Sequence, residues 1–189
     1  MSDIASQDAL QLKKIFHDPK RTNALQNNIG GFYLYRNDSV MKPTKASKNG
    51  LAAVGCLCVL FNDSLLLNSS LKLSLPGAGM GIKIHKDRFS GSLHLHSGNG
   101  IKYKRTEKDR QYVKDLTIVP ETQSLVLATR PGFAPDEIFF GEYSASFKPV
   151  FEKKPGIRLQ VSNYQVRLVF KSQTIALSDS NPQSNTEGK

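Results

Sequence analysis

Between residues 82 and 114 the sequence concentrates basic side chains that could bind phosphate groups or other anions. The stretch contains nine lysines and arginines against three acidic residues. Such side chains neutralise phosphates and lipid headgroups, and complexes held in this way weaken as the salt concentration rises. An ordinary solvated sheet face, whose lysines guard against aggregation, is the alternative interpretation. The candidate anion-binding residues are Lys83, Lys86, Arg88, Lys102, Lys104, Arg105, Lys108 and Arg110.

Three histidines accompany these bases and add groups that change charge between about pH 5 and 8. His94 and His96 are two residues apart, so in a strand both imidazoles point to one side, a spacing that zinc can use. However, no carboxylate or thiol has the same parity nearby, and Lys83 and Lys102 would repel a cation. We therefore expect no metal site, and we assign His85, His94 and His96 a pH-sensitive role in the basic face.

Strands are the elements that must position these side chains. Four segments alternate apolar with polar residues, which is typical of half-buried antiparallel strands. The segments are 71–75, 82–85, 93–96 and 101–104. Turn-forming residues separate them, including an Asn-Gly pair that favours a hairpin. If the strands form a meander, their polar side chains gather on one outer face. That face would carry Lys83, His85, His94, His96, Lys102 and Lys104.

Tyr103 and Tyr112 lie among the bases, as aromatic residues do where nucleic-acid bases stack on a protein surface. Tyr103 shares the apolar parity of Ile101, so we expect its ring to pack inward. No RNP-like signature accompanies the two tyrosines.

No sequence motif for nucleophilic catalysis, a Walker phosphate loop or a zinc protease occurs in the chain. Gly77, Gly79 and Gly81 resemble a phosphate-binding loop only superficially, because a strand is expected after them where a phosphate site needs a helix. Cys56 and Cys58 lie in the apolar run 51–61, where we expect buried, unactivated thiols in a reducing compartment. Together these features predict a non-enzymatic cytoplasmic protein without a cofactor.

The composition predicts one core with tails. The chain has 189 residues, of which 39% are hydrophobic, and this is sufficient for a single globular core. We expect an amphipathic arm at 1–28 that begins with a short helix, a β-rich core at 29–177 and a disordered polar tail at 178–189. About nine or ten strands with short turns predict a mainly β fold: an antiparallel β-sandwich, a jelly roll or a partly closed barrel. The run 51–61 fits a buried strand or a buried helix, and its valines favour the strand.

The net charge of +10 favours an anionic partner. A small basic domain with an N-terminal arm, a β core, a polar tail and no catalytic motif resembles the matrix-type proteins of negative-strand RNA viruses, particularly the small ones of plant rhabdoviruses. The resemblance covers the overall layout; the chain has no tryptophan and no Pro-x-x-Pro or Pro-Pro-x-Tyr peptide.

The resemblance implies a non-enzymatic virion protein that forms homo-oligomers and bridges RNA-containing nucleoprotein to an anionic membrane surface. It would act in the host cytoplasm, at a peripheral membrane, in the virion or in the nucleus. A second hypothesis is a nucleic-acid-binding viral accessory protein, either a cell-to-cell movement protein or a silencing suppressor. A β-sandwich enzyme or carbohydrate-binding module is disfavoured, because the sequence lacks paired carboxylates and tryptophans.

Overall fold

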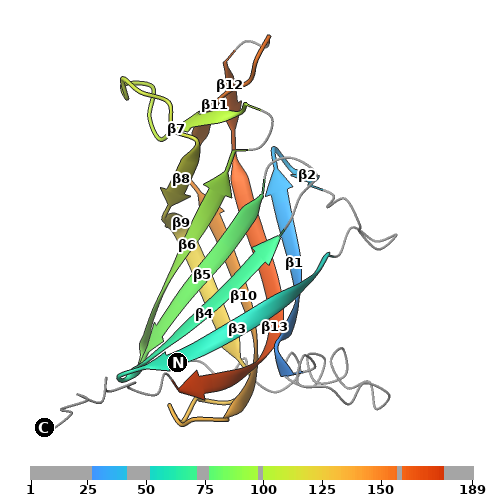
Figure 1. Ribbon diagram of the computed structural model, residues 1–189, viewed down its shortest axis with the longest axis vertical. Helices are drawn as coiled ribbons and strands as arrows, with labels where there is room; N and C mark the ends of the chain where they lie inside the picture. Colours follow the sequence, from blue (N-terminus) through green and yellow to red (C-terminus); the bar gives the residue numbers. More distant parts are fainter. Residues whose placement is uncertain (1–26, 42–51, 72–76, 98–99, 157–158, 177–189) are drawn as a thin grey trace, which may run out of the picture.

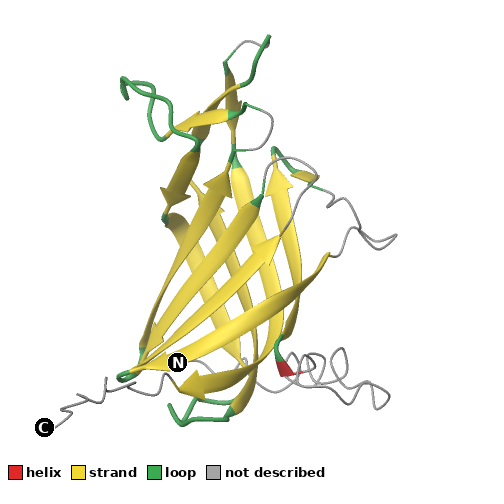
Figure 2. Cartoon of the chain, in the orientation of Figure 1, coloured by secondary structure: helices red, strands yellow, loops and turns green. Residues whose placement is uncertain are grey.

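The computed structural model describes residues 27–41, 52–71, 77–97, 100–156 and 159–176, and strands dominate these ranges (Figures 1 and 2). The expected N-terminal helix and polar tail lie outside the described residues. No helix within these ranges combines the length and the apolarity needed to span a bilayer.

The described residues form thirteen strands in two sheets. The large sheet has the order β8-β6-β5-β4-β3-β1-β13-β10-β9, with β2 paired to β1. Its strands are β1 (Ile29–Arg36), β2 (Ser39–Val40), β3 (Ala52–Phe61), β4 (Ser64–Leu71), β5 (Ala78–His85), β6 (Arg88–His96), β8 (Asp115–Ile118), β9 (Pro120–Leu127), β10 (Ile138–Phe147) and β13 (Tyr164–Ala176). The small sheet contains β7 (Lys102–Lys104), β11 (Val150–Lys153) and β12 (Gln160–Ser162). All pairings are antiparallel except a short parallel contact between β3 and β13.

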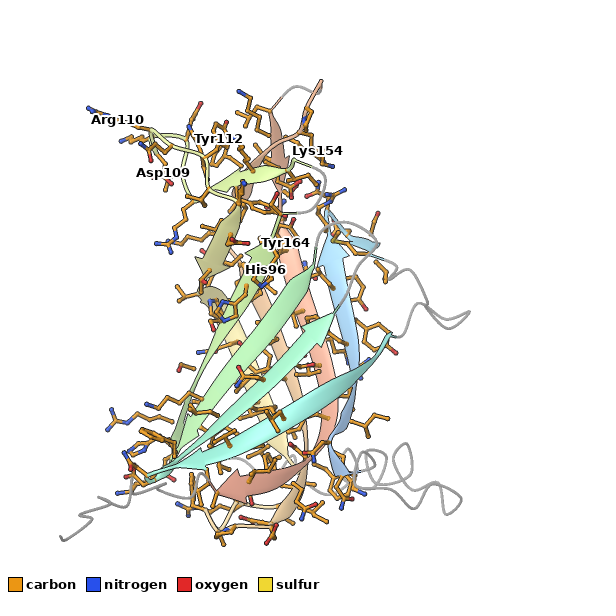
Figure 3. The ribbon with its side chains drawn as sticks, viewed as in Figure 1. His96, Asp109, Arg110, Tyr112, Lys154 and Tyr164 are labelled. Carbon is orange, nitrogen blue, oxygen red and sulfur yellow. The ribbon has the colours of Figure 1, made fainter. Side chains whose placement is uncertain are left out.

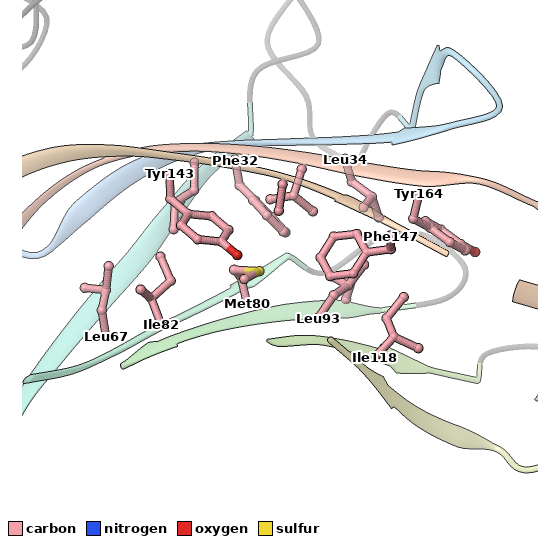
Figure 4. Close-up of a cluster of buried hydrophobic side chains, with 14 of the residues drawn as sticks. Phe32, Leu34, Leu67, Met80, Ile82, Leu93, Ile118, Tyr143, Phe147 and Tyr164 are labelled. Atoms are coloured by element: carbon pink, nitrogen blue, oxygen red, sulfur yellow. The ribbon is translucent and has the colours of Figure 1, made fainter. Parts of the chain in front are cut away.

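The large sheet coils so strongly that its two halves face one another. Figure 1 shows β3 to β6 in front of β1, β13, β10 and β9. Every second residue points into the space between these halves, and Figure 4 shows aromatic side chains such as Phe32 and Tyr143 facing Met80 and Leu93. Burying each large apolar side chain contributes about 1.5–3 kcal/mol, so this alternation stabilises the arrangement. The predicted mainly β, antiparallel, sandwich-like architecture is confirmed.

The two outer edges of the large sheet approach each other along a line that we call the seam. No strand ladder connects β6 to β9 among the described residues, so the sheet is not a closed barrel. Instead, the amide of Gly91 on β6 donates to Oε1 of Gln123 on β9 at 3.0 Å, and the Tyr143 hydroxyl donates to the same oxygen at 3.1 Å. Arg130 and Asp87 form an ion pair of 2.9 Å beyond the ends of these strands. Side chains rather than backbone pairing therefore hold the seam together.

One predicted strand partner is wrong, whereas the antiparallel pairing of β5 with β6 is as predicted. In the predicted segment 71–75, residues 72–75 lie outside the described residues. The segment 101–104 does not continue the meander, because β6 pairs with β8, whereas β7 pairs with β11 in the small sheet. The apolar stretch 138–153 divides at Lys148 and Pro149 into β10 and β11, which belong to different sheets. Proline lacks the amide donor that a ladder needs. Alternation indicates which face a residue occupies, but not which strand lies beside it.

Candidate anion-binding site

The eight predicted anion-binding residues do not share one face. Lys83, Lys86 and Arg88 lie around the β5–β6 turn, at the end of the large sheet where β3 finishes. The other five belong to β7 and the loop that follows it, beside the small sheet at the opposite end (Figure 1). The predicted common face for Lys83, Lys102 and Lys104 is therefore wrong, because β7 leaves the large sheet.

The group beside the small sheet belongs to a surface that we call the basic tip. It consists of β7, the loop 105–114 and residues 153–156. Figure 3 shows Arg110, Tyr112 and Lys154 at this end of the molecule. Together β7 and the loop carry six basic and two acidic side chains, so the basic tip has a clear excess of positive charge.

Two of the lysines in the basic tip place their ammonium groups over the aromatic ring of Tyr112. The Nζ atom of Lys104 lies 4.7 Å from the centre of the Tyr112 ring, and that of Lys153 lies 5.7 Å from the same centre. The face of an aromatic ring attracts a cation without neutralising its charge. Tyr112 thus holds two ammonium groups near each other while their charge remains available to a ligand.

A surface pocket of about 730 Å³ lies within the basic tip. Its lining is Gly100, Lys102, Gln111, Tyr112, Lys153, Lys154, Pro155 and Gly156. Three lysines therefore line the pocket and no carboxylate does. Pockets for small ligands range from about 300 to 1,000 Å³, so the volume suits a group as large as a nucleotide.

Asp109, one of two acidic residues in the loop, accepts hydrogen bonds that shape the loop backbone. Asp109 accepts hydrogen bonds from the Thr106 hydroxyl at 2.8 Å and from the amides of Thr106 and Arg105 at 3.0 and 2.9 Å. These bonds, the hydroxyl first, hold the pKa of Asp109 below its usual range. Among the described residues, no carboxylate forms an ion pair with the pocket lysines.

A buried carboxylate anchors the small sheet to the large one. Glu152 of β11 is 1% exposed; it accepts a hydrogen bond from Arg36 of β1 at 3.3 Å and another from the Tyr164 hydroxyl of β13. Tyr103 lies opposite Glu152 in the ladder, and its buried hydroxyl has no hydrogen-bond partner within the described part. Burial first, and the charge of Glu152 second, raise the pKa of both tyrosines. The prediction that Tyr103 packs inward is confirmed.

The histidines of β5 and β6 lie on the outer face, but they do not form one cluster. Nδ1 of His85 is 3.3 Å from Oδ1 of Asp63, whereas Nδ1 of His96 is 2.9 Å from Oδ1 of Asp115. His94 instead bonds a threonine hydroxyl of β8 at 2.8 Å. The expectation that no carboxylate lies nearby is wrong, because a turn and a distant strand supply the two acids. Across the described ranges, no group of three potential ligands could hold a metal ion.

The two cysteines belong to the core, as predicted. Cys56 and Cys58 are free and fully buried on the inner face of β3. Burial raises the pKa of Cys56 to about 11 and that of Cys58 to about 12. Since the thiolate is the nucleophilic form, these side chains are poor candidates for covalent chemistry at neutral pH.

Lys153 and Lys154 belong to the basic tip, and our sequence analysis missed them. Their signal is weak: two adjacent lysines before a Pro-Gly turn. Only the ladder between β7 and β11, in which Lys153 pairs with Lys102, reveals that they join the other bases. Local patterns carry no information about such a distant partner.

No protein-family model, curated protein sequence or solved structure matches the chain. The resemblance to matrix-type proteins stays a prediction.

Proposed function

We propose that this chain is a non-enzymatic RNA-binding protein that holds phosphate groups in the basic tip. One observation carries the proposal: the pocket is lined by three lysines and a tyrosine, with no carboxylate. Lysines neutralise successive phosphates along a strand, and an aromatic ring offers a surface on which a base stacks.

The shape of the basic tip favours a nucleic acid over a flat lipid surface as its ligand. The pocket is concave, and its polar Gln111 provides an amide that can bond a base edge or a ribose hydroxyl. Lys108 and Arg110 are not part of the pocket lining but lie in the same loop, and they extend the positive surface along the path of a longer strand.

Two wider roles include this contact with RNA. In the first, the chain is a matrix-type viral structural protein that self-associates and bridges nucleoprotein to an anionic membrane in the host cytoplasm. In the second, it is a viral movement protein or silencing suppressor. The first role requires a separate membrane-directed surface, whereas the second requires only the RNA contact.

The test is fluorescence anisotropy of the full chain with a labelled single-stranded RNA at several salt concentrations. We expect log affinity to fall with log salt, and the triple variant Lys102→Gln, Lys153→Gln, Lys154→Gln to flatten the slope by about 2, since each phosphate contact contributes about 0.7. Tyr112→Ala should weaken binding by about 1–3 kcal/mol if a base stacks on the ring.

The matched control removes three cations from the opposite end, through Lys83→Gln, Lys86→Gln and Arg88→Gln. This variant has the same net charge as the pocket variant and should keep most of the salt dependence. Equal losses in the two triple variants would show that net charge alone attracts RNA. That result, or the absence of a salt-sensitive complex, would refute the proposal.

A further inference from the structure

The end of the large sheet opposite the basic tip carries an exposed apolar surface that we call the apolar patch. It consists of the exposed Leu57, Phe61 and Ile175 together with the half-buried Val59 and Leu66. Val59 lies opposite Leu66 in the β3–β4 ladder and opposite Ile175 in the parallel β3–β13 contact. The side chains therefore adjoin one another across three strands.

These apolar residues face outward while their neighbours on β3 face the core. Phe61 is 53% exposed and Leu57 is 47% exposed, whereas the intervening Cys58 is fully buried. Isolated exposed apolar residues are normal, but a contiguous group marks a surface that contacts a partner or a membrane.

Basic side chains border the apolar patch along β5 and β6. Lys83 lies opposite Leu66 in the β4–β5 ladder, and Arg88 lies in the same cross-strand row as Phe61. Neither Lys83 nor Arg88 forms an ion pair within the described ranges, and Lys86 in the turn makes only a long one of 3.9 Å. Asp63 and Asp87 lie in the adjoining turns, but Asp87 is paired with Arg130 at 2.9 Å. Lys83, Lys86, Arg88 and Arg130 thus outnumber these two acids, and the margin of the apolar patch has a net positive charge.

We propose that this face docks on an anionic lipid bilayer, with the apolar patch at the boundary between headgroups and acyl chains. We call it the docking face, and it comprises the apolar patch together with Lys83, Lys86 and Arg88. Lys83, Lys86 and Arg88 then lie at the level of the negative headgroups. Apolar burial and attraction to an anionic surface together produce stable interfacial binding, whereas either one alone is weak. The inference concerns a different ligand from RNA and does not rest on the proposed function.

Charge complementarity favours a bilayer as the ligand of this face over a second copy of the chain or an RNA. A second copy of the chain on the same patch would bring Lys83 and Arg88 of both copies to the margin of one interface, where like charges repel. RNA supplies negative charge but little apolar surface for Leu57 and Phe61. An anionic bilayer supplies both.

The docking face and the basic tip lie at opposite ends of the long axis of the molecule (Figures 1 and 3). A bilayer bound at one end leaves the other end accessible. Only this consequence rests on the proposed function: with RNA in the basic tip, one chain binds lipid and RNA at the same time, as a bridging protein must.

The test is co-sedimentation of the full chain with two kinds of vesicle: phosphatidylcholine alone, and phosphatidylcholine mixed with phosphatidylserine. We expect binding to the mixed vesicles that weakens with salt. Each base near the surface contributes roughly five-fold in affinity, so the triple variant Lys83→Gln, Lys86→Gln, Arg88→Gln should bind on the order of 100-fold more weakly.

Two further variants test the apolar contribution to vesicle binding and the location of the binding surface. Leu57→Ser with Phe61→Ser should reduce binding but preserve its salt dependence, and far-UV circular dichroism checks that this variant folds. The basic-tip variant Lys102→Gln, Lys153→Gln, Lys154→Gln is the charge-matched control and should sediment like the wild type.

Three outcomes would overturn the inference. The wild type could fail to sediment with the mixed vesicles, or the basic-tip variant could lose as much binding as the docking-face variant. In the third outcome, the serine substitutions abolish a dimer seen by sizing without changing vesicle binding, which would identify a second copy as the occupant. RNA binding, measured separately on the same variants, is independent of all three.

Discussion

Replacing Glu152 by alanine should release the small sheet from the large one. The substitution removes the buried carboxylate that accepts hydrogen bonds from Arg36 and Tyr164. Removing one partner of a buried ion pair costs about 3–5 kcal/mol. Because the Arg36 side chain is 24% exposed, water partly solvates the remaining charge, and we expect the lower end of this range.

A loss of about 3 kcal/mol is large against the roughly 5–15 kcal/mol that stabilises a whole domain. For a chain of this size it corresponds to a decrease in Tm of roughly 6–12 °C. Glu152→Gln keeps the shape and one acceptor for Tyr164, so its effect should be smaller. Tyr164→Phe removes a hydrogen bond to a charged group, which is worth about 1.5–3 kcal/mol.

Urea unfolding followed by far-UV circular dichroism measures these differences, since the chain contains no tryptophan for fluorescence. Hydrogen exchange should show that Glu152→Ala first loses protection in β7, β11 and β12, while β4 and β5 remain protected. RNA affinity should also fall, although no pocket residue has changed. Glu121→Ala, at an exposed position of β9, is the matched acidic control. If Glu152→Ala and Tyr164→Phe both stay within about 0.5 kcal/mol of wild type, the anchoring argument fails.

Two further predictions concern the seam and the core. Gly91→Ala places a methyl group against the Tyr143 hydroxyl and 2.6 Å from the Tyr143 Cζ, so thermal unfolding should show a loss of stability of about 1–3 kcal/mol. The control is Gly55→Ala, which should leave Tm almost unchanged because no atom lies within 4 Å of the added methyl group. Equal changes in Tm for the two variants would contradict the predicted clash at Gly91. Burial raises the pKa of Cys56 from 9.0 to about 11 and that of Cys58 from 9.0 to about 12. The unfolded state therefore gains the charged form first, and stability falls as pH rises above about 9. Each thiol contributes up to about 1.4 kcal/mol per pH unit, and a double alanine variant whose urea midpoint has the same alkaline pH dependence as wild type would disprove this.

Alternation in the sequence correctly predicted which side chains face the core. In β5, Ile82 and Ile84 are buried while Lys83 is exposed, and in β6 Leu93 and Leu95 are buried on either side of His94. Within the apolar run, residues 52–61 form the strand β3, as the valines favoured. These features are local, because the position of a side chain relative to a pleated backbone repeats every two residues.

Strand partners could not be predicted in the same way. The placement of β7 depends on β11, on the buried Glu152 and on Arg36 from the first strand, all of which are distant in sequence. For the same reason five cations of the basic tip were predicted from the sequence, but Lys153 and Lys154 were not. The acids beside His85 and His96 could not be predicted either, since Asp63 and Asp115 reach them through tertiary contacts.

The seam also bears on how the protein avoids aggregation. Unpaired strand edges act as templates on which a strand from another molecule can add. Here the buried amide of Gly91, which has no strand partner on this side, donates to Gln123, and β9 begins with Pro120, which has no amide hydrogen. At these two positions the edges of β6 and β9 shield each other from the addition of another strand.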